Sequence, residues 1–413
     1  MPRVRAPRIP SLGRISIAVL AWVLPAGAAA QTWTEDEVIA RAAEASPEAQ
    51  SALLAARLEE ARARTAGLLP NPSIEWERQQ TFEPNIQGQD LVRAVIPLNL
   101  SGRPHAQQAL AQVDAELARA SAARTQADVV ESALRLFYRA LALERRAELL
   151  AQALEALEEA RRVLAARAAE GDVAGYDAAR LALESELARS HVSEAELDAA
   201  AARGGLAALL ASEAPRALEG ELAPSMPASL AALLARAQDR RADRAAVRSA
   251  EEAAARARAA ASFAWVPMLE VTGGYNRQFD AMAEGHGYIF VLSAAIPLFE
   301  NGQQERERSA VAESLMTSYR EGLDRQIAAE VRAAHAQLTG LLAERERFAA
   351  AVAEPLAIVV RASASGYREG ERSVVELVDA RRSATEAGER ALALELAARL
   401  AELRLRRVSG ALR

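Results

Sequence analysis

Two acidic side chains near the end of the chain, Glu376 and Asp379, have the spacing that points most clearly to a function. Residues three apart lie on one face of a helix, so both carboxylates point the same way. A symmetric assembly would bring several such pairs around one axis, and a ring of acidic side chains selects cations. The alternative is an ordinary acidic pair on a solvated helix surface.

Residue types that carry catalysis or bind metals are scarce elsewhere. The chain has no cysteine, which excludes disulfides, thiol nucleophiles and cysteine-based metal sites. Its four histidines are dispersed, and none has a partner at ligand spacing: His105, His191, His286 and His335. We therefore expect no enzymatic activity, no metal site and no cofactor.

Composition favours long helices. Hydrophobic residues make up 51% of the 413 residues but aromatic residues only 4%, and the chain is rich in alanine, the best helix former. Such helices can pack closely without the bulky core of a globular enzyme. The 50 basic residues, all arginine, against 56 acidic ones give a net charge of -6, which does not favour nucleic-acid binding.

Residues 1–30 have the features of a signal peptide. Several arginines precede an apolar stretch from Ile15 to Leu24, and the alanines at 28–30 form a small-residue cleavage site. The apolar stretch is about 10 residues long, too short to span a bilayer as a helix. We expect an exported mature protein that begins at Gln31; the alternative is an uncleaved anchor helix.

The mature chain is one unit used twice. Ile96-Pro97-Leu98, followed by a glycine, recurs 200 residues later as Ile296-Pro297-Leu298, again followed by a glycine. Prolines between 215 and 227 mark the join, so the first repeat is expected at 31–225 and the second at 226–413.

Each repeat is expected to contain a helix, two strands, a very long helix, a glycine turn and another helix. The strands alternate apolar and polar side chains over about 10 residues, as transmembrane β-strands do. They are expected at about 72–82, 90–100, 268–279 and 288–298. For any single strand, a half-buried position in a soluble sheet is the alternative.

Four strands cannot close a barrel, and lipid does not tolerate an open sheet edge. Several chains must therefore pool their strands, and these physical arguments do not choose between two chains and three. The long helix after 102 would be ~100 Å long, and a leucine at every seventh position predicts coiled-coil packing: Leu136, Leu143, Leu150, Leu157 and Leu164. Pro355 is expected to kink its counterpart.

These features resemble the TolC family of outer-membrane efflux channels from about Thr34 to Arg407. The most specific stretch is Gly366 to Arg372, with the pattern Gly-Tyr-x-x-Gly-x-Arg, followed by an acidic run at 375–380. A second signature is Pro-Leu-Phe-x-x-Gly at 297–302. The compact length and the lack of a lipidation cysteine look closest to the heavy-metal (cobalt–zinc–cadmium type) branch.

The resemblance implies a mainly α protein with membrane β: long coiled-coil helices that form a periplasmic α-barrel, and four strands per protomer pooled into a twelve-stranded β-barrel of a homotrimer. It implies an outer-membrane exit duct for small substrates such as heavy-metal cations or drugs. The implied partners are a periplasmic adaptor (membrane fusion) protein and a proton-driven inner-membrane pump. An outlet for type I protein secretion has the same architecture and stays open.

The resemblance also places a closed periplasmic entrance at the helix turns. The implied tip turns are Gly171 and Gly370, and the implied pore constriction is Glu376 with Asp379. The implied latch consists of Asp177, Tyr367 and Arg372. The family can carry aspartate where this chain has Glu376, so we expect a different bore.

Two other classes of exported protein also have long helices. A periplasmic adaptor would place its β-segments around one helical hairpin, without two strand pairs 200 residues apart. A coiled-coil scaffold would lack such strands altogether.

Overall fold

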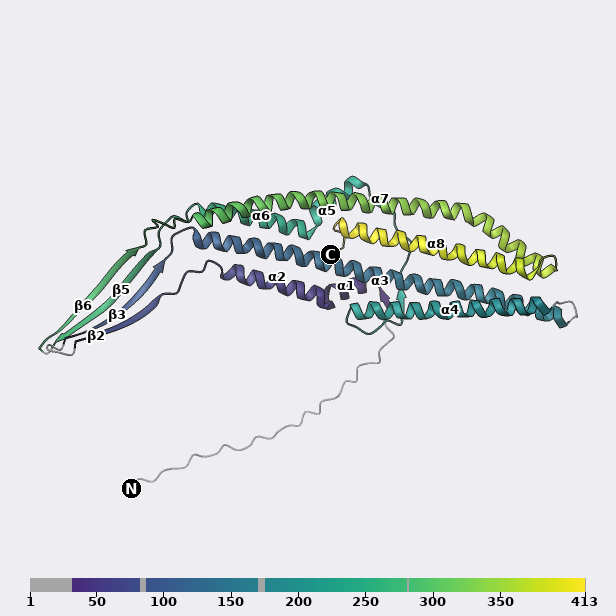
Figure 1. Ribbon diagram of the computed structural model, residues 1–413, viewed down its shortest axis with the longest axis horizontal. Coiled ribbons are helices and arrows are strands. Elements are labelled where there is room, and N and C mark those ends of the chain that lie inside the picture. The colour runs from purple at the N-terminus through teal and green to yellow at the C-terminus, as the bar shows by residue number, and fades with distance from the viewer. Residues whose placement is uncertain (1–31, 82–86, 170–174, 281, 413) are drawn as a thin grey trace, which may run out of the picture.

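The computed structural model describes residues 32–81, 87–169, 175–280 and 282–412. The expected signal peptide, Gln31 and Gly171 lie outside these residues. The molecule is elongated, with a slender sheet at one end and long helices that run away from it (Figure 1).

The same order of elements occurs twice along the chain. The first set is β1 (Thr32–Thr34), α1 (Glu35–Ala45), α2 (Pro47–Thr65), β2 (Ser73–Gln80), β3 (Gln87–Leu98), α3 (Arg103–Ala169) and α4 (Gly175–Leu209). The second set is β4 (Ala217–Glu219), α5 (Leu230–Arg240), α6 (Ala242–Ala261), β5 (Leu269–Asp280), β6 (Glu284–Ala294), α7 (Gln303–Glu369) and α8 (Val374–Val408). The duplication seen in the sequence is thus a duplication of structure.

The four long strands form one antiparallel sheet in the order β2-β3-β5-β6. The strands β3 and β6 start several residues earlier than the alternation alone predicted, because polar residues continue the strand pairing toward the hairpin loops. β2 and β6 are the two edges, so within the described part of one protomer each has a single strand neighbour.

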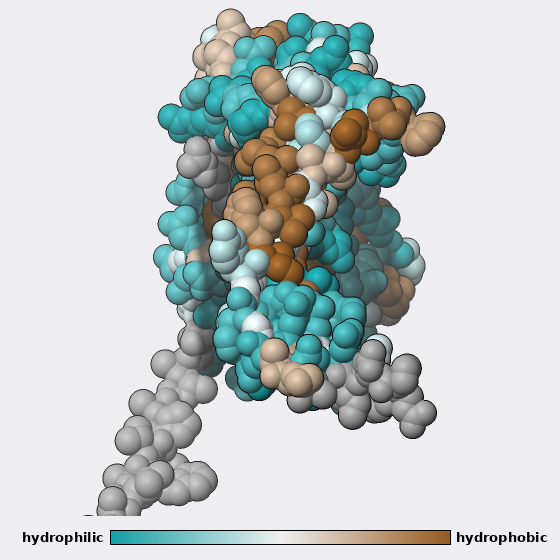
Figure 2. All heavy atoms as spheres, turned by 90° about the vertical axis from the view of Figure 1, so that its left-hand side faces the viewer, coloured by the Kyte–Doolittle hydropathy of each residue, from teal (hydrophilic) through white to brown (hydrophobic). Residues whose placement is uncertain are grey.

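The two faces of this sheet differ as the alternation predicted. One face carries exposed apolar side chains: Ile74, Trp76, Val92, Ile96, Tyr275, Tyr288, Phe290 and Leu292. The other carries mainly polar ones, with Val95 and Val291 among them: Glu75, Glu77, Arg93, Glu270, Asn276 and Ser293. Figure 2, which views the strand end of the molecule, shows the apolar side chains as a hydrophobic band.

The helices form the rest of the body. α3 packs against α2, α4, α6 and α8, and α7 packs against α6 and α8. The predicted leucine seam of α3 is buried at Leu150, Leu157 and Leu164. α7 continues through Pro355 without ending, and it bends toward its C-terminal end in Figure 1.

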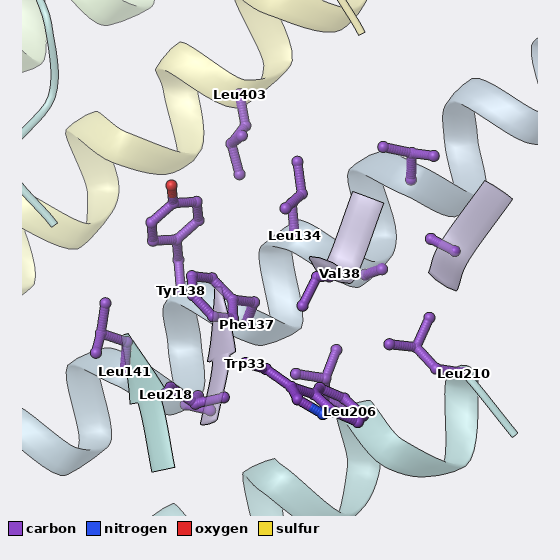
Figure 3. Close-up of a cluster of buried hydrophobic side chains, with 14 of the residues drawn as sticks. Trp33, Val38, Leu134, Phe137, Tyr138, Leu141, Leu206, Leu210, Leu218 and Leu403 are labelled. Atoms are coloured by element: carbon purple, nitrogen blue, oxygen red, sulfur yellow. The ribbon is translucent and has the colours of Figure 1, made fainter. Parts of the chain in front are cut away.

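The largest buried side chains gather midway along the helices. Trp33 and Val38 from the start of the chain pack against Phe137 of α3, Leu206 of α4 and Leu403 of α8 (Figure 3). This core joins both repeats, because it draws on the first strand and on the last helix.

A polar network lies beside this core. The Tyr138 hydroxyl donates to Glu35, and Arg399 donates to Glu35 at 3.1 Å and to Glu402 at 2.7 Å. Burial, followed by the hydrogen bond with Glu35, raises the pKa of Tyr138. The network fixes the N-terminal segment to α8 and so joins the two ends of the chain.

The two-faced sheet predicts an asymmetric response to charge. Leu292→Arg places a charge on the apolar face, which costs roughly 2–4 kcal/mol near the middle of a bilayer, whereas Ser293→Arg places it on the polar face opposite Glu270. We expect the first variant alone to lose membrane insertion, measured as assembled protein in the outer-membrane fraction. Equal yields would mean that the faces are wrongly assigned.

Candidate channel entrance

The turn between α7 and α8 lies at the end of the molecule far from the sheet (Figure 1). Gly370 has a φ of +82°, a left-handed conformation that glycine adopts without strain. Its N–H donates to the carbonyl oxygen of Tyr367 at 3.3 Å, and the N–H of Glu371 donates to that of Gly366 at 2.8 Å. These two bonds form a Schellman motif that ends α7. Gly370 therefore lies in the turn where it was expected.

α8 starts with a capping box. The N–H of Glu376 donates to Ser373 Oγ at 3.3 Å, and the N–H of Ser373 donates to the Glu376 carboxylate at 2.9 Å. Arg372 adds a contact of 3.2 Å to the same carboxylate. The hydrogen bonds from Ser373, followed by the charge of Arg372, hold the pKa of Glu376 below its usual value. This carboxylate is therefore ionised at neutral pH.

Glu376 and Asp379 are exposed on the same side of α8. Leu377 and Val378 between them are buried against the neighbouring helices. One protomer thus presents both carboxylates together, as their spacing predicted. That they face a pore stays a prediction, since it depends on the neighbouring protomers.

Tyr367 is buried close to the same turn, with 3% of its surface exposed. Its ring packs among Leu164 of α3, Leu181 of α4 and Val374 of α8. No described residue makes a hydrogen bond with its hydroxyl. Burial raises the pKa of this hydroxyl; the charge of Arg167 opposes the shift and that of Asp177 adds to it.

The three expected latch residues therefore come to one end of the molecule but do not bond directly. Among the described residues, no hydrogen bond joins Asp177 to Tyr367 or to Arg372. The side chain of Arg372 instead passes the bare backbone of Gly366 and reaches Glu376, one turn into α8. A latch across protomers would fall to Arg372, whose side chain is 46% exposed, because the hydroxyl of Tyr367 is buried within the protomer.

Arg167, which the sequence did not single out, makes the direct tie between the two hairpins. From α3 it donates to the carbonyl oxygens of Tyr367 at 3.2 Å and Arg368 at 3.3 Å. A cation at the C-terminal end of α7 also meets a favourable helix dipole. A Cβ at Gly370 would lie 2.7 Å from the end of the Arg167 side chain, which would have to move aside, and the positive φ is what favours glycine at this position. A basic residue in the last turn of α3 was the only sequence signal, because its acceptors are backbone atoms.

Within the residues that the structure describes, no three His, Asp or Glu side chains lie close enough together to hold a metal ion.

Comparison with solved structures identifies the fold. The chain superposes on CusC with a TM-score of 0.70 at 17% identity, over 91% of this chain and 92% of CusC. It superposes on the open state of the Neisseria gonorrhoeae MtrE outer membrane channel with a TM-score of 0.69 at 18% identity, over 91% and 88% of the two chains. For the Campylobacter jejuni CmeC outer membrane channel the TM-score is 0.67 at 13% identity, over 99% and 94%.

No family model and no curated protein sequence matches the chain. The likeness is therefore one of fold. It confirms the expected fold class: the chain has the architecture of TolC-like outer-membrane channels, mainly helical with four antiparallel strands.

The Arg167 contacts predict that the tip loosens when they are removed. Arg167→Gln loses charge-assisted hydrogen bonds, each worth about 1.5–3 kcal/mol. Hydrogen exchange of the amides at 366–372 should therefore become faster. The control is Arg162→Gln, an exposed arginine on the same helix. Identical protection in both variants would show that Arg167 does not hold the end of α7.

Proposed function

We propose that this protein is the outer-membrane exit duct of a tripartite efflux pump, a passive channel rather than an enzyme, that acts as a homotrimer. The observation that carries the proposal is the sheet: one apolar face, one polar face and two unpaired edges. In a bilayer such a sheet is stable only as part of a closed barrel. Three copies would supply twelve strands, with the polar faces around the lumen.

Unpartnered apolar faces on the helices support the same assembly. Along the helix layer, α2 and α4 lie at one end and α7 at the other, as the packing order α2-α3-α6-α7 shows. The exposed leucines of α2 and α4 are Leu53, Leu54, Leu58, Leu183, Leu187 and Leu197. The exposed apolar side chains of α7 are Val311, Leu315, Tyr319, Ile358 and Val359. Packing of the α7 face of one copy on the α2–α4 face of the next would close a ring.

α7 also contains a stretch that is long and apolar enough to cross a membrane by length and composition, and little of it is buried in the protomer. In the proposed trimer this stretch lies against a neighbouring protomer, which accounts for its apolar character without a membrane-spanning helix.

Finer points belong to the same proposal. The duct would extend into the periplasm, receive small substrates such as heavy-metal cations or drugs, and bind a periplasmic adaptor and a proton-driven inner-membrane pump. The acidic pair at the proposed entrance supports a cation route. The solved channels superpose with nearly equal TM-scores, so the fold does not resolve the heavy-metal branch. An outlet for type I protein secretion is the alternative, and isolation of the channel with its native pump would decide between them.

The exported form is proposed to start at Gln31 after cleavage of residues 1–30. The N-terminal mass of the protein isolated from outer membranes tests this point directly.

The entrance residues predict a change in conductance. Tyr367→Phe with Arg372→Ser removes a hydroxyl that is buried at the tip and a half-exposed guanidinium, which in the trimer would bond across protomers to groups such as Asp177. The tips should then splay, and planar-bilayer conductance should rise several-fold while the amount of trimer stays constant. An unchanged conductance would place the closure elsewhere.

The acidic pair predicts cation selectivity. Glu376→Gln with Asp379→Asn removes the charges, and glutamine can still complete the capping box with Ser373. Reversal potentials in a KCl gradient should shift toward those of an unselective pore. Glu371→Gln, in the same turn, is the matched control.

The reversal potentials can also be measured as a function of pH. Because the hydrogen bonds from Ser373 lower the pKa of Glu376, its charge persists to lower pH than that of an ordinary glutamate, so wild-type selectivity should survive mild acidification. Reversal potentials that are identical in wild type and double variant would contradict a pore-lining position.

A further inference from the structure

The strand register aligns side chains in rows across the apolar face of the sheet. One row consists of Trp76, Val92, Tyr275 and Tyr288, and its three aromatic rings are exposed. Aromatic rows of this kind mark the edge of the hydrocarbon layer on membrane barrels. The next row toward the strand tips is polar: Arg78, Asp90, Arg277 and His286. Figure 2 shows the hydrophobic band giving way to hydrophilic residues.

Phe279 and Asp90 hold the two arginines of this row in place. The Phe279 ring lies over Gly88 of the neighbouring strand, where an added Cβ would come within 2.2 Å of it. The guanidinium carbons of Arg78 and Arg277 lie 5.4 Å and 5.6 Å from the centre of this ring. Asp90 lies 3.7 Å from Arg78 and 4.0 Å from Arg277. Both guanidinium groups are thus ordered beside one aromatic ring.

These guanidinium groups keep most of their hydrogen-bonding capacity. The side chains of Arg78 and Arg277 are 47% and 44% exposed, whereas that of Asp90 is 17% exposed. The Nε–H of Arg277 donates to the Glu284 carboxylate. Among the described residues, no acceptor makes a hydrogen bond with the terminal nitrogens of Arg277 or with any nitrogen of Arg78. Five N–H donors on each guanidinium suit phosphate oxygens.

The opposite face at this level offers nothing comparable. There the strands carry the neutral amides Gln79, Gln89 and Gln278. The cationic groups are therefore confined to the face that the apolar band assigns to lipid, just beyond the aromatic row.

We propose that Arg78 and Arg277 bind the phosphate groups of a phosphorylated glycolipid in the outer leaflet. The inference rests on the proposed function, which places the strand tips on the outer side of the membrane. Lipid headgroups lie immediately beyond the aromatic row of a membrane barrel. Arginine binds phosphate through charge-assisted, often bidentate hydrogen bonds, the stronger class. Phe279 and Asp90 orient the guanidinium groups for this contact.

The test counts lipid on the intact assembly. Wild-type protein, Arg78→Gln with Arg277→Gln, and the control Arg93→Gln are exposed to vesicles that contain lipopolysaccharide, re-isolated and examined by native mass spectrometry. Arg93 is a matched control because it lies on the polar face and pairs with Glu75 at 2.7 Å. We expect the double variant to retain about tenfold less lipopolysaccharide, and the control to retain as much as wild type.

A second probe tests the chemistry, and a conductance measurement separates the two proposals. Dephosphorylated lipopolysaccharide should bind the wild type as weakly as the intact lipid binds the double variant. Equal lipid retention by double variant and wild type, or equal binding of the dephosphorylated lipid, would overturn the inference. Single-channel conductance should be the same in wild type and in the double variant, whose substitutions lie on the lipid face, so a wild type that conducts but does not retain lipid contradicts the lipid site alone. If the double variant does not assemble, Arg78→Gln alone, which breaks no hydrogen bond among the described residues, gives the same comparison.

Discussion

Unpaired backbone groups along β2 and β6 are the constraint on which the rest of the structure depends. Each edge presents N–H and C=O groups that lipid cannot satisfy, and the apolar side chains between the edges need a covering of lipid or protein. Pairing with further copies satisfies both. The helix layer follows the order of the strands. The helix α2 precedes the edge strand β2, α7 follows the edge strand β6, and these two helices form the two ends of the layer.

At the end of the molecule far from the sheet, the structure depends on how the helices end. Arg167 of α3 joins the two hairpin tips by donating to the last carbonyls of α7, where the chain turns at Gly370, beside the apolar cluster around Tyr367. The same turn leads into a capping box that keeps Glu376 ionised. The turn thus combines a structural tie with an exposed negative charge, which is the arrangement that a narrow, cation-attracting opening would need.

The sequence predicted what depends on local pattern. Alternation in β2, β3, β5 and β6 correctly separated the two faces of the sheet, and the leucine spacing predicted the buried side of α3. Contacts that join distant segments were beyond it. The partner of Arg372 is Glu376 rather than Asp177, because the capping box places that carboxylate within reach. The contacts of Arg167 could not be predicted, because its acceptors are backbone carbonyl oxygens, which every residue has. The row of side chains beside Phe279 can be identified only when the strand register is known.

The central claim is that three chains share one barrel, and the mass of the assembly tests it most directly. Protein extracted in mild detergent from outer membranes should give, by native mass spectrometry, a complex of three chains that separates into single chains on heating. A complex of two chains, or a single chain released as a soluble periplasmic protein, would contradict the account.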